Sequence, residues 1–134
     1  MPVRNVPVAE VGPLARDVML KSPDTVPAGM TVAAARDLLE SPRLRMLLVA
    51  DGDRLIGAIA RERLAVEPDG EIALGRLADP DSPRVGPDET VAHVLEVLEI
   101  AGTERLPVVD ERDRLLGLIC FNRAKRHFCV DAAP

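Results

Sequence analysis

Two arginines, Arg63 and Arg123, each stand six residues after a glycine, Gly57 or Gly117. A guanidinium group has donors only, set in a planar fork that fits a phosphate or a carboxylate. In a chain with a formal net charge of -5, two such groups facing clefts could select a polyphosphate or an acidic metabolite. The alternative is an exposed helical arginine that pairs with a nearby carboxylate such as Glu67.

The cysteines and histidines do not predict a metal site. Cys120, Cys129, His93 and His127 lack the spacing of zinc ligands, and two cysteines are too few for a disulfide framework. We interpret the cysteines as free buried thiols, although Cys120 could also form a weak hydrogen bond or respond to oxidants.

The chain has no Gly-rich loop ending in Lys-Ser or Lys-Thr, no GxSxG elbow and no HExxH motif, so we predict that it is not an enzyme.

The composition argues against nucleic-acid and membrane functions. Two Phe are the only aromatic residues, so recognition of unpaired bases by stacking is nearly excluded. Twenty-two acidic residues against seventeen basic ones repel nucleic acid and anionic lipid. No apolar stretch approaches the ~20 residues of a membrane helix. Residues 1–11 lack the pattern of a secretory signal, so we expect a cytoplasmic protein.

A basic cluster near the C-terminus leaves two interpretations open. It consists of Arg123, Lys125, Arg126 and His127. These side chains could contact a phosphate or the acidic face of a partner. The alternative is a short helix with cations at its C-terminal end, where the helix dipole favours them without any ligand.

An internal repeat organises the chain. An offset of 59 places residues 25–51 over 84–110, and an offset of 60 places 53–63 over 113–123. Fifteen of the 38 aligned positions are identical. Residues 67–71, with Pro68, Asp69 and Gly70, have turn chemistry and no apolar period, so we interpret them as a short linker between the repeats.

The sequence pattern of each repeat predicts its secondary-structure elements in the order strand, helix, strand, strand, helix. Thr31 and Thr90 stand where a hydroxyl would cap the first helix of each repeat. Gly57 and Gly117 are each the third residue of a strand, where a side chain would crowd a neighbour or a ligand. The predicted elements are strands at 25–26, 46–50, 55–60, 84–85, 106–109 and 115–121, and helices at 14–20, from 31, 61–66, from 90, and 122–128.

The fold class predicted from these elements is α/β (α+β). A repeat of ~60 residues is marginal as an independent fold, so we expect the two to pack as a pseudo-twofold pair with clefts where their sheets meet. The predicted organisation is an N-terminal extension at 1–12, repeats at 13–66 and 72–128, the linker at 67–71 and a tail at 129–134.

The repeats resemble cystathionine-β-synthase (CBS) domains, which occur in tandem as a pair called a Bateman module. The resemblance covers residues 14–128. The residues that carry it are Asp17-Val18-Met19, Thr31-Val32-Ala33, Thr90-Val91-Ala92, Leu106-Pro107-Val108-Val109-Asp110 and Asp113-Arg114-Leu115-Leu116-Gly117-Leu118-Ile119.

The resemblance implies a non-catalytic regulatory module that dimerises and binds adenine nucleotides or S-adenosylmethionine in its clefts. In the family's usual pattern, Ser or Thr follows the strand glycine by three residues and Asp follows it by six; the carboxylate accepts hydrogen bonds from a ribose diol. This chain departs from that pattern, with Ala60 and Arg63 in the first repeat and Cys120 and Arg123 in the second. Arginine cannot accept those bonds.

We therefore predict a regulatory CBS pair that senses an adenine nucleotide or related phosphorylated metabolite. AMP, ATP and S-adenosylmethionine are the candidate ligands, and a homodimer with a further protein partner is expected. The alternative is a degenerate pair that has lost ligand binding and serves in dimerisation or docking. The candidate ligand-binding residues are Thr25, Val26, Leu47, Arg63, Val85, Leu106, Pro107, Cys120 and Arg123.

Overall fold

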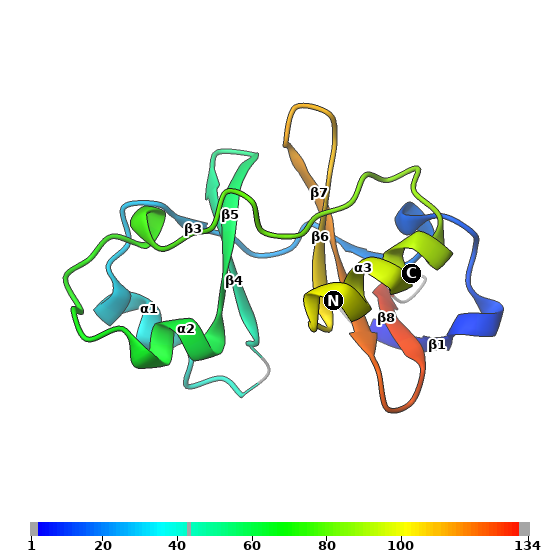
Figure 1. Cartoon of the computed structure of the whole chain (residues 1–134), viewed down its shortest axis with the longest axis horizontal. Helices are drawn as coiled ribbons and strands as arrows, with labels where there is room; N and C mark the ends of the chain where they lie inside the picture. Colours follow the sequence, from blue (N-terminus) through cyan, green and yellow to red (C-terminus); the bar gives the residue numbers. More distant parts are fainter. Residues whose placement is uncertain (1–2, 43, 132–134) are drawn as a thin grey trace. The chain divides into compact units, whose positions relative to one another are not determined.

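The computed structural model describes residues 3–42 and 44–131. Two compact units divide the chain: Asp24–Ser82, here called the central unit, and a terminal unit that joins the described residues of Met1–Pro23 and Pro83–Pro134. Each unit has its own sheet and its own hydrophobic core. Figure 1 shows the elements of both. No helix in the described part of the chain is long and apolar enough to cross a membrane.

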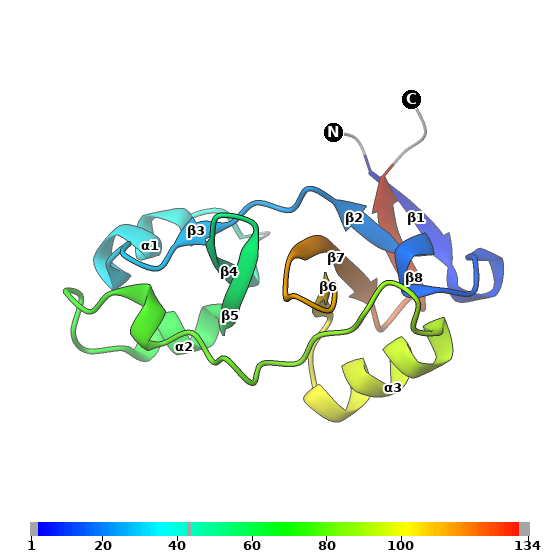
Figure 2. The ribbon, with the colours of Figure 1, turned by 90° about the horizontal axis from the view of Figure 1, so that it is seen from above.

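The central unit is built on a three-stranded sheet. Strand β3 (Val26–Pro27) runs parallel to β4 (Met46–Asp51), and β4 is antiparallel to β5 (Arg54–Ala60). Helices α1 (Val32–Leu38) and α2 (Arg61–Val66) lie on one side of β4 and β5 (Figure 2), and the turn η3 (Leu74–Arg76) follows. The core residues of this unit are Val26, Val32, Ala35, Leu47, Val49, Ile59, Leu64, Leu74 and Ala78.

The terminal unit has a five-stranded sheet in the order β1-β8-β7-β2, with β6 also paired to β7. Helix α3 (Val91–Ala101) packs on this sheet, because Val94 and Leu98 share a core with residues of β6, β7 and β8. The strands are β1 (Val3–Pro7), β2 (Met19–Lys21), β6 (Arg105–Val109), β7 (Leu115–Asn122) and β8 (His127–Asp131), and the short turns are η1 (Val8–Glu10) and η2 (Ala15–Asp17).

The predicted helix caps are confirmed in both repeats. The Thr31 hydroxyl accepts a hydrogen bond from the Ala34 amide at 3.2 Å, and the Thr90 hydroxyl accepts one from the His93 amide at 3.1 Å. Each bond satisfies one of the amides that a helix start leaves without a partner.

The duplication is visible in equivalent hydrogen bonds within the two units. In the central unit the Leu74 amide donates to the Met30 carbonyl; in the terminal unit the Ala15 amide donates to the Glu89 carbonyl. The two hydrogen bonds are equivalent, because Met30 and Glu89 are 59 residues apart, as are Ala15 and Leu74. Each unit therefore contains most of one predicted repeat together with the first residues of the other, 72–82 in the central unit and 13–23 in the terminal unit.

The close approach predicted at Gly57 and Gly117 is confirmed. A Cβ atom on Gly57 would lie 2.8 Å from the backbone carbon of Asp79 and closer still to its oxygen. On Gly117 it would lie 2.7 Å from the backbone oxygen of Leu20. Leu20 and Asp79 are themselves 59 residues apart, so the same backbone segment of the duplicated structure covers both glycines.

The predicted helix at residues 14–20 is wrong. Residues Ala15–Asp17 form a single 3-10 turn, and Met19–Lys21 form strand β2, paired antiparallel with β7. The cause is tertiary: pairing with β7 outweighs the local helical preference of a stretch too short to hold a helix by itself.

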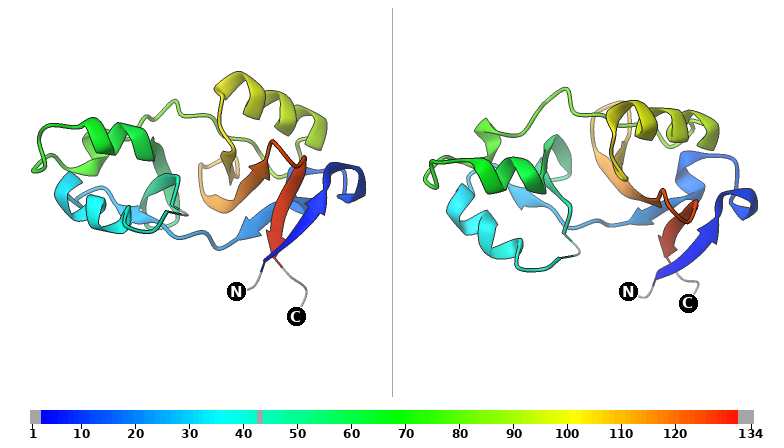
Figure 3. Two further views of the ribbon diagram at one scale, coloured as in Figure 1. Left: turned by 90° about the horizontal axis from the view of Figure 1, so that it is seen from below. Right: turned by 60° about the horizontal axis from the view of Figure 1, so that its bottom comes forward.

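The predicted helix at residues 122–128 is also wrong. The Asn122 side chain accepts a hydrogen bond from the Lys125 amide, Arg126 turns the chain with a φ of +55°, and β8 begins at His127. In β8, buried residues alternate with half-buried ones, and this period of two favours a strand. Figure 3 shows β8 beside β1, with which it pairs in antiparallel register.

Both ends of the chain therefore contribute to the sheet of the terminal unit. Residues 3–7 of the predicted extension form β1, and residues 129–131 of the predicted tail complete β8. Residues 1–2 and 132–134 lie outside the described residues. The mixed α+β fold class is confirmed. The second repeat ends in a strand where a helix was expected, and its predicted strand at 84–85 is reduced to a single bridge between Val85 and Val108.

Candidate functional site

A cavity of about 600 Å³ lies in the central unit, at the side-by-side strands β3 and β4. Val26 and Leu47 form its buried wall, with 8% and 4% of their surface exposed, and Thr25 precedes β3 at its edge. Its volume falls in the range of small-ligand sites. The described lining residues are Asp24, Thr25, Val26, Pro27, Met30, Leu38, Ser41, Leu44, Met46, Leu47 and Leu48.

The lining is mostly apolar, and several of its residues were missed by the sequence analysis. Met30, Leu44 and Met46 are half-buried, and Leu38 at the end of α1 is 40% exposed. Asp24, Thr25 and Ser41 add polar groups. Such a cavity can take a flat apolar ring and hydrogen-bond a polar group attached to it.

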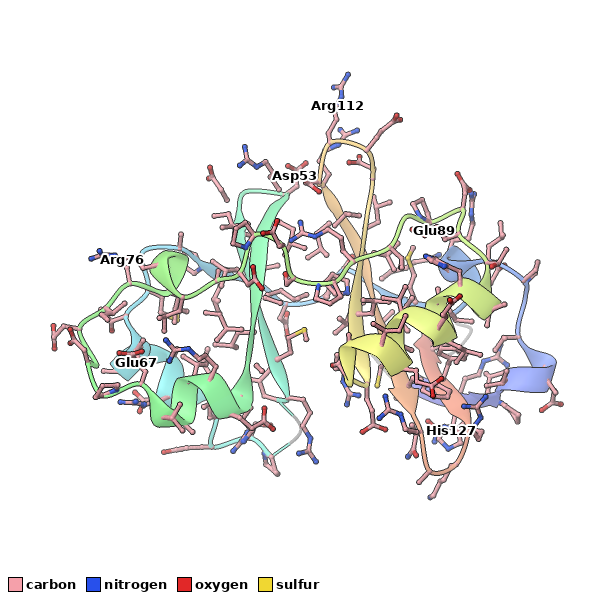
Figure 4. The ribbon with its side chains drawn as sticks, viewed as in Figure 1. Asp53, Glu67, Arg76, Glu89, Arg112 and His127 are labelled. Carbon is pink, nitrogen blue, oxygen red and sulfur yellow. The ribbon has the colours of Figure 1, made fainter. Side chains whose placement is uncertain are left out.

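The cavity brings together three of the four candidates in the first repeat: Thr25, Val26 and Leu47. Arg63 is not among its described lining residues. Its guanidinium lies 2.8 Å from the carboxylate of Glu67, one helical turn further along. Figure 4 shows Glu67 beside α2. The alternative in which Arg63 pairs with a nearby carboxylate thus describes its contact in the structure.

The candidates of the second repeat are not gathered in this way. Val85 is 2% exposed and lines a separate cavity of about 690 Å³, whose lining includes the carboxylates of Asp88, Glu89, Asp110, Glu111 and Asp113. Leu106 and Pro107 are buried in β6, Leu106 within the core. Cys120 is buried in β7, directly opposite Cys129 in β8.

Carboxylates outnumber the one arginine, Arg84, in the described lining of the second cavity, and this charge balance disfavours an anionic ligand. Asp110 accepts backbone hydrogen bonds from Arg114 and Arg112 at the β6–β7 turn, and its side chain also contacts the Arg114 guanidinium. These contacts lower the pKa of Asp110, so its carboxylate is charged at neutral pH. Figure 4 shows Arg112 at the tip of this hairpin.

Arg123 holds the end of α3. One of its guanidinium nitrogens donates to the carbonyls of Leu98 and Thr103, at 3.2 and 3.1 Å. The Leu98 carbonyl also accepts from the Thr103 amide, so Arg123 adds a charged donor at the C-terminal turn of α3. Arg123 also lines a cavity of about 450 Å³ between α3 and β7, together with Arg126.

Arg61 makes the equivalent contact in the central unit. Its guanidinium donates to the carbonyls of Leu39 and Leu44, at 2.6 and 3.0 Å, and also to that of Ser41. Leu39 and Leu44 correspond to Leu98 and Thr103 by the offset of 59. The alignment matched Arg123 with Arg63, but the structure gives this helix-end contact to Arg61.

We expect Arg61→Ala to lower the free energy of unfolding by about 1.5–3 kcal/mol, because three carbonyls lose a charged donor. Arg63→Ala should cost about 1 kcal/mol or less, because the Arg63 side chain is 46% exposed and solvent weakens its ion pair with the buried Glu67. Urea denaturation followed by circular dichroism measures both. Equal losses would contradict the assignment of the structural role to Arg61.

The basic cluster does not form a helix end. Lys125 and Arg126 are exposed in the turn between β7 and β8, and the Arg126 guanidinium lies 5.4 Å from the centre of the Phe121 ring. His127 begins β8, as Figure 4 shows. Within residues 3–42 and 44–131, no group of three or more His, Cys, Asp and Glu side chains is placed to hold a metal ion.

The sequence matches the family described as CBS domain twice, over residues 15–68 and 74–126. A curated relative is inosine-5'-monophosphate dehydrogenase of Korarchaeum cryptofilum (strain OPF8), 29% identical over 104 residues. The match covers 78% of this chain and 21% of the relative, so the chain spans about a fifth of that protein's length.

Solved structures share the fold. Hypoxic Response Protein I with two coordinated zinc ions is 29% identical, with a TM-score of 0.68 over 80% of this chain and 92% of the other. The cytosolic domain of the Mg²⁺ channel MgtE in complex with ATP is 26% identical, with a TM-score of 0.72 over 84% and 48%. CBSX2 in complex with AMP is 22% identical, with a TM-score of 0.71 over 85% and 93%.

Proposed function

The chain belongs to the CBS domain family and carries two such domains in tandem, and we propose that it is a non-catalytic regulatory protein that binds an adenosine-containing ligand. The observation that carries this proposal is the apolar cavity of the central unit, which gathers Thr25, Val26 and Leu47. The related MgtE domain and CBSX2 were solved with ATP and AMP, both of which contain adenosine. The adenine ring would lie between the apolar side chains.

Asp24 supplies the carboxylate that the family pattern lacks here. Arg63 replaces the usual ribose-binding acid, but Asp24 lines the same cavity as Thr25 and Val26. A carboxylate can accept hydrogen bonds from both hydroxyls of a ribose. We expect Asp24→Asn to weaken ligand binding about tenfold, since bonds to a charged acceptor contribute more than neutral ones. Unchanged affinity would remove Asp24 from the site.

The charge of the cavity predicts the relative affinities of the candidate ligands. Asp24 is the one charged side chain among its described lining residues. A single negative charge disfavours a polyphosphate and favours a ligand with little negative charge. The expected order of affinity is therefore S-adenosylmethionine, then AMP, then ATP. Titration calorimetry at low and moderate salt measures this order, and the gap between S-adenosylmethionine and ATP should narrow as salt rises.

A cavity variant tests the proposed site directly. Leu38→Glu puts a carboxylate on the apolar wall of the cavity and should weaken the binding of AMP and S-adenosylmethionine while the protein stays folded, and of AMP more strongly because AMP is itself negatively charged. The matched control is Ile100→Glu, at an 80% exposed position of α3 outside this cavity, which should bind as the original chain does. Absence of binding by the original chain would contradict the proposal.

Absence of binding would instead favour a module for dimerisation or docking. One observation supports that alternative: Arg63 and Arg123 are both engaged by neighbouring groups of the protein, Glu67 and the end of α3. A pure docking module should keep its oligomeric state and partner affinity in Leu38→Glu, whereas a sensor should lose its response to ligand.

We place this function in a cytoplasmic homodimer that contacts a further protein. A ligand would act by favouring one arrangement of the dimer or the complex, to the extent that its affinity differs between the two states. Sedimentation equilibrium with and without S-adenosylmethionine tests the dimer and its response. A monomer under both conditions would contradict this part of the proposal.

A further inference from the structure

We propose that Cys120 and Cys129 are a thiol pair that forms a reversible disulfide between β7 and β8. The two residues are direct partners in the antiparallel register of these strands. Directly opposite residues of such strands point to the same face of the sheet, with Cβ atoms about 4.5–5.5 Å apart. A disulfide needs only a small approach from that separation.

The neighbouring contacts hold the two strands together at this point. One position further along, the rings of Phe121 and Phe128 pack with their centres 4.9 Å apart. Phe121 and Phe128 belong to the core, so the cysteines lie on the opposite face of the sheet. The Cys129 thiol also lies 3.6 Å from the side-chain oxygen of Asn5 in β1. The pair therefore has a defined position in the reduced protein.

The two thiols differ in accessibility, which sets the order of the reaction. Cys129 is half-buried, whereas Cys120 is buried. Burial and a hydrogen bond with Cys129 raise the pKa of Cys120 to about 12, so this thiol is protonated at neutral pH. The more accessible Cys129 reacts first with an external oxidant, and Cys120 acts as the resolving thiol.

The oxidant is a small disulfide such as oxidised glutathione. The Cys129 thiolate attacks one sulfur of glutathione disulfide, forms a mixed disulfide and releases one glutathione thiolate. Cys120 then gives its proton to water and attacks the Cys129 sulfur, which forms the protein disulfide, breaks the mixed disulfide and releases the second glutathione thiolate; the two glutathione thiolates take up the protons lost by the protein. Two protein thiols are oxidised and one glutathione disulfide is reduced to two glutathione molecules.

The bond would fasten the C-terminal strand to the sheet of the terminal unit. Strand β8 pairs with both β7 and β1, so the disulfide would also stabilise the attachment of β1. Because a cross-link restricts the unfolded chain, the oxidised protein should melt a few degrees above the reduced protein. A thiol reductant should reverse the shift.

The experiment is incubation of the full chain with glutathione disulfide, followed by intact-mass spectrometry. The expected product has lost two hydrogens, carries no glutathione and has no free thiol. Cys120→Ser should stop at the mixed disulfide on Cys129, and Cys129→Ser should remain largely unmodified because Cys120 is buried. Circular dichroism of both variants establishes that they are folded.

Three outcomes would overturn the proposal. The first is a stable glutathione adduct on the original chain, which would show that Cys120 does not reach Cys129. The second is a disulfide between two chains on a non-reducing gel. The third is equal modification of Cys120 in Cys129→Ser, which would contradict the order of reaction.

Discussion

Replacing Phe128 with alanine should lower the free energy of unfolding by about 3–5 kcal/mol. Phe128 is fully buried, packs against Phe121 and belongs to the core that joins α3 to the sheet of the terminal unit. Deleting its ring removes apolar burial and leaves a cavity that the neighbouring strands can fill only in part. Urea denaturation followed by circular dichroism gives the value.

The control for Phe128→Ala is Val66→Ala, which removes an apolar side chain that is 72% exposed at the end of α2. It should change the free energy of unfolding by no more than about 0.5 kcal/mol. A comparably small effect of Phe128→Ala would show that β8 is not packed in the core, contrary to its register with β7.

Replacing Gly57 with alanine should lower the free energy of unfolding by about 1–3 kcal/mol. The added Cβ would meet the backbone of Asp79, 2.8 Å from its carbonyl carbon. The obstacle is backbone, so no side chain can rotate away to make room. The segment would have to move off β5, and this movement would break the hydrogen bond from the Ala58 amide to the Ser82 hydroxyl. Thermal and urea denaturation measure the loss.

Gly29→Ala is the matched control within the same unit. A Cβ atom at Gly29 meets nothing within 4 Å, and the backbone there does not have a positive φ. The substitution should be neutral or slightly stabilising, because alanine has fewer unfolded conformations than glycine. If Gly57→Ala were equally neutral, the close contact with Asp79 would not exist in solution.

The two repeats have diverged most at the element that follows the strand glycine. After Gly57 the chain enters α2, whereas after Gly117 strand β7 continues to Asn122 and the chain returns as β8. Arg63 therefore lies on a helix, whereas its aligned counterpart Arg123 lies in the turn between β7 and β8. The cavity that gathers Thr25, Val26 and Leu47 lies in the central unit.

Local signals in the sequence were sufficient for much of the fold. Thr31 and Thr90 cap helices because a hydroxyl beside a helix start satisfies its free amide wherever the helix lies. The turn at Gly52, with a φ of +62°, follows from the residue itself. The duplication, and with it the family, needed only the aligned identities.

The tertiary structure decided what depends on partners distant in sequence. Residues 19–21 become a strand because they pair with β7, and residues 127–131 pair with both β7 and β1. These pairing partners are distant in sequence, except for the hairpin of β7 and β8, and pairing with them outweighs the helix expected from the short segments themselves. Arg61, not Arg63, reaches the carbonyls at the end of α1, because only the folded backbone determines which of two nearby side chains points there. The spacing of residues in the sequence predicted which residue types could form the site. The contacts in the folded chain determined which individual residues lie together.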